Sequence, residues 1–302
     1  MSVTTTTPTL AKSAFDTPGK GRGLLDIFNH RYLLKLLIGK STSLRYRNSV
    51  MGWLWSYARP TVQFLLYWFV MGQLLGMHKN VPYFPIYLFS GLVVVNFFNE
   101  AIGNVTRSIV DNKALVRKIY LPRELFPVAA LISAFVNFLP QLAVLVVVCI
   151  FNGWVPTFEN IGMFLGGMAI VMPFVLGLGL IFCAVNVRFR DAQNVVEIIR
   201  TIATWSSPVM YTWQMVYKHA HGWHSWLFDI YMSNPVTVAV ELFHKAFWGP
   251  VVPKDDLKAL AQVAFPPHFG LYIVFGVIVT ILLLLIGQMV FRRFERTFAQ
   301  DL

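Results

Sequence analysis

Three histidines lie close together, where their ring nitrogens could coordinate a metal ion. His219, His221 and His224 stand in a segment that also holds Trp223 and Trp226. A metal site needs further ligands to complete its coordination, and no cysteine or well-placed carboxylate is nearby. Short histidine clusters are weak motifs. We therefore expect these histidines to lie beside the tryptophans at a membrane interface, and the sequence leaves their role open.

The segment Gly39-Lys40-Ser41-Thr42 looks like the end of a nucleotide-binding P-loop. The full motif requires a second glycine five residues before Gly39, after a β-strand, so that backbone amides surround the phosphates. That position holds Leu34, and a helical pattern precedes it. We therefore expect this chain to bind no ATP, and no cofactor, of its own.

Glu100 is the one carboxylate deep within a long apolar run. A charged side chain near the centre of a membrane helix costs about 2.5–3.5 kcal/mol on insertion scales, so each one is a candidate for function. A proton relay would need several such groups facing one another. We expect a structural ion pair instead, near the cytoplasmic end of the helix.

Aromatic residues are abundant, with 26 Phe, 11 Tyr and 9 Trp. Ring faces stack on the apolar C–H faces of sugars without fixing one register, which suits a conducting path that must bind weakly at many places. Phe64 and Trp68 are one helical turn apart and share a face. Tyr211 follows Ser207-Pro208, where proline can loosen a helix. We predict that Phe64, Trp68 and Tyr211, called the aromatic trio below, line a glycan path.

These residues would be carried by an all-α membrane protein. Apolar runs long enough to cross a bilayer need roughly 20 residues. Six runs qualify, and we place the spans at 60–77, 84–103, 127–150, 161–187, 195–216 and 269–291. A polar tail (1–22) and an amphipathic membrane-surface helix (24–40) precede them, within one membrane domain covering 23–302. An aromatic segment (217–267) separates the last two spans.

Charge placement gives the orientation. Of the 302 residues only 13% are charged, which is too few to cover a soluble globular domain. The net charge of +11 could indicate nucleic-acid binding, but 20 of the 25 Lys and Arg fall in four segments that alternate with uncharged runs. That pattern is typical of cytoplasmic loops. It predicts both termini in the cytoplasm and argues against a nucleic-acid partner.

Two glycine pairs have the small-xxx-small spacing that lets helix backbones approach. Gly72 and Gly76 form one pair, and Gly162 and Gly166 form the other. Either pair could form a packing seam, within the subunit or between two copies. Glycine is also simply common in membrane helices, and the sequence does not decide between these interpretations.

Six motifs, in order along nearly the whole chain, resemble a known family. They lie at residues 44–55 with Arg59-Pro60, at 112–124 with Pro127, at 188–191, at 207–211, at Asn234-Pro235 and at 291–298. They are similar to ABC-2 type permeases that export O-antigen, teichoic acid, capsule and related cell-wall glycans. Phe243-His244 departs from the pattern, because an arginine is expected there.

The resemblance implies a homodimer of six-span subunits in the bacterial inner membrane, with two copies of a separate ATPase subunit that binds ATP and Mg. It also implies transport of a lipid-diphosphate-linked glycan, helix 24–40 as an interface helix, an extracytoplasmic gate region over 217–267, and re-entrant gate helices within Trp213 to Trp248. The segment 107–124 would couple to the ATPase through Asn112, Leu115, Arg117, Lys118, Tyr120 and Arg123. We expect Arg45, Arg47 and Arg59, in the first motif, to meet the lipid diphosphate.

Other functions remain open at this point. A multi-span glycosyltransferase or lipid-carrier enzyme would need paired acidic residues at a membrane face to hold a metal, and the inner loops offer only scattered acids. An ion-coupled transporter would need more ionisable groups within the spans. An ABC-2 exporter of another lipid-like substrate is a further alternative. The sequence does not identify the polysaccharide, its chain length, or a carbohydrate-binding domain on the ATPase.

Overall fold

The computed structural model describes residues 23–46, 54–118, 121–220, 225–253 and 257–302. Within these ranges every regular element is helical. In chain order the helices are η1 (Gly23–His30), α1 (Arg31–Tyr46), α2 (Trp55–Tyr67), η3 (Trp68–Leu74), α3 (Met77–Asn80), α4 (Phe84–Asp111), α5 (Lys113–Lys118), α6 (Leu125–Phe151), α7 (Phe158–Arg188), α8 (Ala192–Trp205), α9 (Trp213–Ala220), α10 (Ser225–Met232), α11 (Pro235–Phe243), η4 (His244–Trp248), η5 (Gly249–Val251), α12 (Leu257–Val263), α13 (Phe269–Glu295) and α14 (Phe298–Asp301).

Four of these helices, α4, α6, α7 and α13, are long and apolar enough to cross a membrane. They have 28, 27, 31 and 27 residues, so each extends roughly 40 Å, against a hydrocarbon core of about 30 Å. The predicted spans at 84–103, 127–150, 161–187 and 269–291 each lie inside one of them. The structure therefore confirms four apolar helices of spanning length at the predicted places.

Three predicted helices differ from the structure. The interface helix expected at 24–40 is a 3-10 helix over Gly23–His30 followed by α1, which continues to Tyr46. The span expected at 60–77 is α2 followed by the π-helix η3, and it ends at Leu74 because Gly76 turns the backbone into the left-handed region (φ +70°). The span expected at 195–216 is not one helix, since α8 ends at Trp205.

The break after α8 has a tertiary cause. Pro208 lacks an amide hydrogen and disfavours helical backbone at the residue before it. The Tyr87 hydroxyl of α4 lies within 2.7 Å of the carbonyl oxygens of both Pro208 and Tyr211, so it satisfies backbone that a helix would otherwise have paired. The backbone over 206–212 is therefore not helical.

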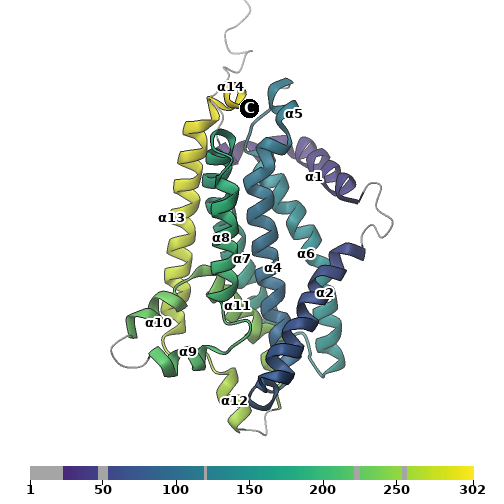
Figure 1. Cartoon of the computed structure of the whole chain (residues 1–302), viewed down its shortest axis with the longest axis vertical. Helices are drawn as coiled ribbons and strands as arrows, with labels where there is room; N and C mark the ends of the chain where they lie inside the picture. Colours follow the sequence, from purple (N-terminus) through teal and green to yellow (C-terminus); the bar gives the residue numbers. More distant parts are fainter. Residues whose placement is uncertain (1–22, 47–53, 119–120, 221–224, 254–256) are drawn as a thin grey trace, which may run out of the picture.

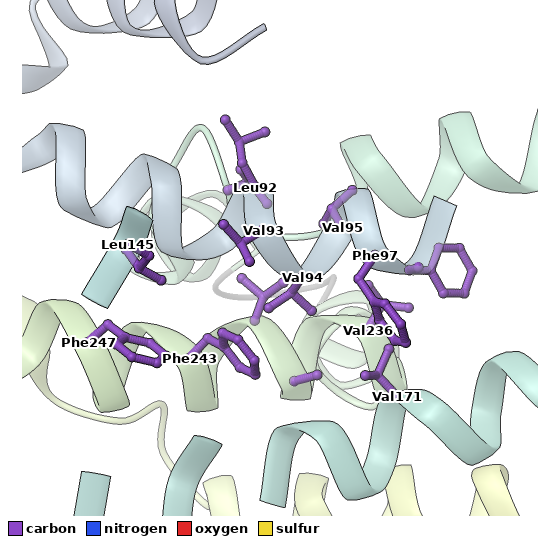
Figure 2. Packing of buried hydrophobic residues seen from close by; sticks show 14 of the residues in the cluster. Leu92, Val93, Val94, Val95, Phe97, Leu145, Val171, Val236, Phe243 and Phe247 are labelled. Carbon is purple, nitrogen blue, oxygen red and sulfur yellow. The ribbon is translucent and has the colours of Figure 1, made fainter. Parts of the chain in front are cut away.

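The chain returns to this break through α11. Asn234 caps α11 by accepting from the Val236 amide (3.0 Å), and its side-chain amide donates to Ser206 Oγ (3.3 Å). The segment α11–η4 is buried between α4 and α7, and its far end is fixed where Trp248 Nε1 donates to the Pro82 carbonyl (2.7 Å). Figure 2 shows Phe243 and Phe247 of this segment beside α4 in the core. The short helical segment α11–η4 is therefore part of the buried core.

The ends of the bundle carry different elements. Helices α1, α5 and α14 gather at the top of Figure 1, near the C-terminus, whereas α9, α10 and α12 lie at the opposite end. The three basic side chains of α5, Lys113, Arg117 and Lys118, are exposed there, and the basic Arg188–Asp191 turn joins α7 to α8 at the same end. The basic residues of α5 and of the α7–α8 turn are therefore collected at one end of the molecule.

A glycine contact joins α7 to α13, but not at the predicted seams. A Cβ at Gly287 would lie 2.9 Å from the carbonyl carbon and 3.1 Å from the Cα of Gly177, so only glycines allow these backbones to touch. Gly162 has nothing within 4 Å of such an atom, and Gly76 is a turn. Gly177–Gly287 is therefore a close crossing of two helix backbones within the subunit, and a seam between two copies at either predicted glycine pair stays a prediction.

Candidate functional site

A polar stripe runs along α4, one of the four apolar helices. Its members recur at helical spacing and face within about 140° of one another: Asn96, Asn99, Glu100, Gly103, Asn104 and Arg107. All but Gly103 and Arg107 are half-buried, Gly103 is buried and Arg107 is exposed. Polar side chains facing lipid are costly, so this stripe must face protein or water. We call these six residues the α4 polar stripe.

Neighbouring helices supply hydrogen-bond partners to the stripe. Asn137 of α6 donates to Glu100 Oε1 (2.7 Å), and Asn104 lies 3.5 Å from the same oxygen. On the other side, Asn99 donates to Thr204 Oγ1 of α8 (3.0 Å). The stripe therefore joins α6 to α8 through amides and hydroxyls, which also suit the hydroxyl groups of sugars.

Arg200 of α8 completes this side of the stripe. Its guanidinium lies directly against Gly103, so that a larger side chain at this position would have to displace the guanidinium, and it donates to Glu197 (2.8 Å) one turn before it. A cation is thus held beside the polar stripe and paired on its own helix. Of the stripe residues, only Glu100 could be recognised as a candidate from its charge within an apolar run. The periodic asparagines around it were the signal that could have revealed the stripe.

The aromatic trio is packed against the core. The rings of Phe64 and Phe89 lie 5.3 Å apart, edge to face, and Trp68 packs on the same core from η3. The Tyr211 hydroxyl donates to the Trp205 carbonyl (2.6 Å). All three side chains are half-buried, so one part of each ring packs on α4 or α8 and another part is accessible. Whether they line a path remains a prediction.

The expected coupling segment is divided between two helices and a loop. Residues 107–111 belong to α4, and α5 is a separate short helix at the end of the bundle. Asn112 joins them: its side chain accepts from Lys40 Nζ (2.9 Å) and donates to the Ser108 carbonyl (2.8 Å). The structure therefore fixes the position of α5 relative to α1 and α4.

The remaining residues of this segment have different surroundings. Leu115 is half-buried in a cluster with Phe291 and Phe298 from the C-terminal region, and Arg123 places its guanidinium 5.8 Å from the centre of the Phe298 ring. Arg117 and Lys118 are exposed, and Tyr120 lies outside the described residues. The accessible part of the segment is therefore basic.

The other predicted groups are described only in part. Arg45 lies in α1 and Arg59 in α2, and their side chains are not described; Arg47 lies outside the described residues. His219 is exposed, and its Nδ1 lies 2.8 Å from the Met215 carbonyl, whereas His221 and His224 lie outside the described residues. Among described side chains, no group of three His, Cys, Asp or Glu is placed to hold a metal.

Comparison with known proteins adds similarity over most of the chain. The ABC-2 type transporter family matches residues 32–248. An O-antigen export system permease protein, RfbA of Myxococcus xanthus, is 31% identical over 79% of this chain and 89% of its own length. RfbA of Klebsiella pneumoniae is 24% identical over 91% and 98%. The polysialic acid transport protein KpsM of Escherichia coli is 24% identical over 67% and 76%.

Proposed function

Because this chain belongs to the ABC-2 type transporter family, we propose that it is the permease subunit of an ATP-driven exporter that moves a lipid-diphosphate-linked polysaccharide out of a bacterial cytoplasm. The observation that carries the proposal is similarity to O-antigen export permeases over 79% and 91% of this chain. The α4 polar stripe supports it, because regularly spaced amide side chains would be costly on a helix face that contacts only lipid.

The permease works as a homodimer. Helix α8 exposes an apolar row, Val195, Ile198, Ile202 and Trp205, and α2 packs only lightly on α4 and α6. The α4 polar stripe lies beside α8 and is half-exposed in one subunit. A second copy would close this stripe off from lipid and form a shared path between the subunits. The aromatic trio would add ring surfaces to that path.

The end of the bundle that carries α1, α5, the α7–α8 turn and the C-terminus faces the cytoplasm. Basic side chains are retained on the cytoplasmic side of membrane proteins. In this orientation α2–η3 supplies one of the remaining spans, α8 together with the non-helical segment 206–212 supplies the other, and α9–α10 and α12 lie at the outer surface. The exposed cations Arg117 and Lys118 of α5 then meet the ATPase partner, which binds ATP and Mg.

Gene deletion and complementation test the proposal. Deletion in the source bacterium should remove one surface polysaccharide and cause its lipid-linked form to accumulate inside, and the tagged chain should co-purify with an ATPase. Accumulation of a lipid without a glycan would instead indicate an ABC-2 exporter of another lipid-like substrate. Glycan that fails to be synthesised at all would indicate a glycosyltransferase or lipid-carrier enzyme.

A further inference from the structure

A polar cavity of about 260 Å³ lies between α1, α4 and α6, toward the basic end of the bundle. It is lined by Leu37, Lys40, Ser41, Asn104, Ser108, Asp111, Asn112, Phe126, Ala129, Ala130, Ser133 and Asn137. Pockets for drug-sized ligands occupy roughly 300–1,000 Å³, so this cavity suits one ring-sized group and excludes a long lipid chain.

Two hydrogen bonds hold α1 across this cavity. Lys40 Nζ donates to Asn112 Oδ1 (2.9 Å) at the end of α4, and the hydroxyl oxygens of Ser41 and Ser133 lie 2.6 Å apart at α6. Ser133 is buried and also donates to the Ala129 carbonyl (2.8 Å). These hydrogen bonds therefore fix α1 in place as one wall of the cavity.

The lining has the chemistry of a sugar site. Amides and hydroxyls both donate and accept hydrogen bonds, as sugar hydroxyls do, and Lys40 adds donors while Asp111 adds acceptors. Leu37, Phe126 and Ala130 form an apolar wall that fits the C–H face of a sugar ring. One cation and one anion leave the lining close to neutral, and Asp111 would repel a diphosphate.

The cavity also connects with the α4 polar stripe. Asn104 belongs to both, and Asn137, which lines the cavity, donates to Glu100 of the stripe (2.7 Å). A sugar held in the cavity would therefore lie at the cytoplasmic end of a continuous row of amides and hydroxyls.

We propose that this cavity binds one neutral sugar residue of the transported glycan before it moves onto the α4 polar stripe. This inference rests on the proposed function and adds to it a loading site at the interface helix, distinct from the aromatic trio.

Filling the cavity tests the proposal. Ala130→Leu places a larger apolar side chain in the cavity, and Ala143→Leu, the same change on the exposed face of α6, is the matched control. Surface glycan is measured in the complemented deletion strain, relative to the amount of inserted protein. The larger side chain in A130L should remove about two hydrogen bonds to the sugar and lower export about tenfold, whereas A143L should export normally.

Photo-crosslinking supplies an independent readout, because it detects the bound group directly and does not depend on the amount of glycan exported. The photoreactive residue p-benzoylphenylalanine is placed at Leu37, which lines the cavity, or at its exposed neighbour Leu36. Mass spectrometry of the adduct should find a sugar at position 37 and not at 36. An adduct at 37 with a lipid headgroup lacking sugar, or equal sugar adducts at both positions, would overturn the inference.

The two proposals fail differently. If the wild-type chain restores no surface polysaccharide, the proposed function is wrong and the inference falls with it. If the wild type exports normally and A130L exports as much per inserted molecule as A143L, the loading site alone is wrong.

Discussion

Gly287→Ala should separate α7 from α13 and destabilise the subunit. The added methyl would lie 2.9 Å from the carbonyl carbon of Gly177, whereas ordinary contacts of a Cβ begin near 3.4 Å. The neighbouring atoms are backbone and cannot rotate away, so the helices must part by at least about 0.5 Å. Overpacking costs about 1–3 kcal/mol, and two rigid backbones place this site at the upper end.

Gly162→Ala is the matched control on α7, because nothing lies within 4 Å of its added methyl. Alanine gains up to about 1 kcal/mol over glycine in a helix, and both variants share this gain. The net effects are then a loss of about 2 kcal/mol for G287A and a small gain for G162A, a difference of about 3 kcal/mol.

Thermal stability of the detergent-extracted protein measures this difference. At about 2 °C per kcal/mol, the low end suited to a chain of this size, the Tm of G287A should lie about 6 °C below that of G162A. The apparent Tm is followed by the fraction of monodisperse protein that survives heating. Equal Tm values for the two variants would refute the claim that glycine is required at this crossing.

Three further predictions concern topology, coupling and the path. In intact cells, a membrane-impermeant thiol reagent should label Pro156→Cys and leave Arg190→Cys unlabelled; labelling of R190C from outside would contradict the orientation. Reversing the charge of Arg117 and Lys118 together should weaken ATPase co-purification and export while insertion persists, whereas Lys35→Glu on α1 leaves co-purification unchanged; unaltered co-purification of the double variant would show that α5 is not the docking site. Alanine at each member of the aromatic trio should slow export at normal stability if the rings line the path; unstable protein with normal export per molecule would show that they only pack helices.

The places of the four long apolar helices could be predicted from the sequence, and the starts of two of them to the residue, although α4 continues to Asp111, eight residues past its predicted end. Helix α4 begins at Phe84 and α13 at Phe269, where their apolar runs begin. This succeeds because a membrane span must be apolar along its own length and must pair its backbone within itself, so its signal is local.

The breaks could not be predicted in the same way. Pro208 marks a weak point, but a span can tolerate proline when neighbours satisfy the freed carbonyls. The end of α8 at Trp205 depends on Tyr87, more than 100 residues earlier, whose hydroxyl takes over the carbonyls of Pro208 and Tyr211. A hydropathy profile cannot reveal that long-range hydrogen bond.

The same distinction between local sequence signals and long-range contacts applies to the candidate site. By itself, the sequence determined the membrane class, the four long helices, the clustering of basic residues and the family motifs, because each depends on the composition of one segment. Only the tertiary structure placed Asn137 and Thr204 beside the α4 polar stripe, and Lys40 across the cavity. A buried polar group is stable only with a partner, and its partner can come from anywhere in the chain.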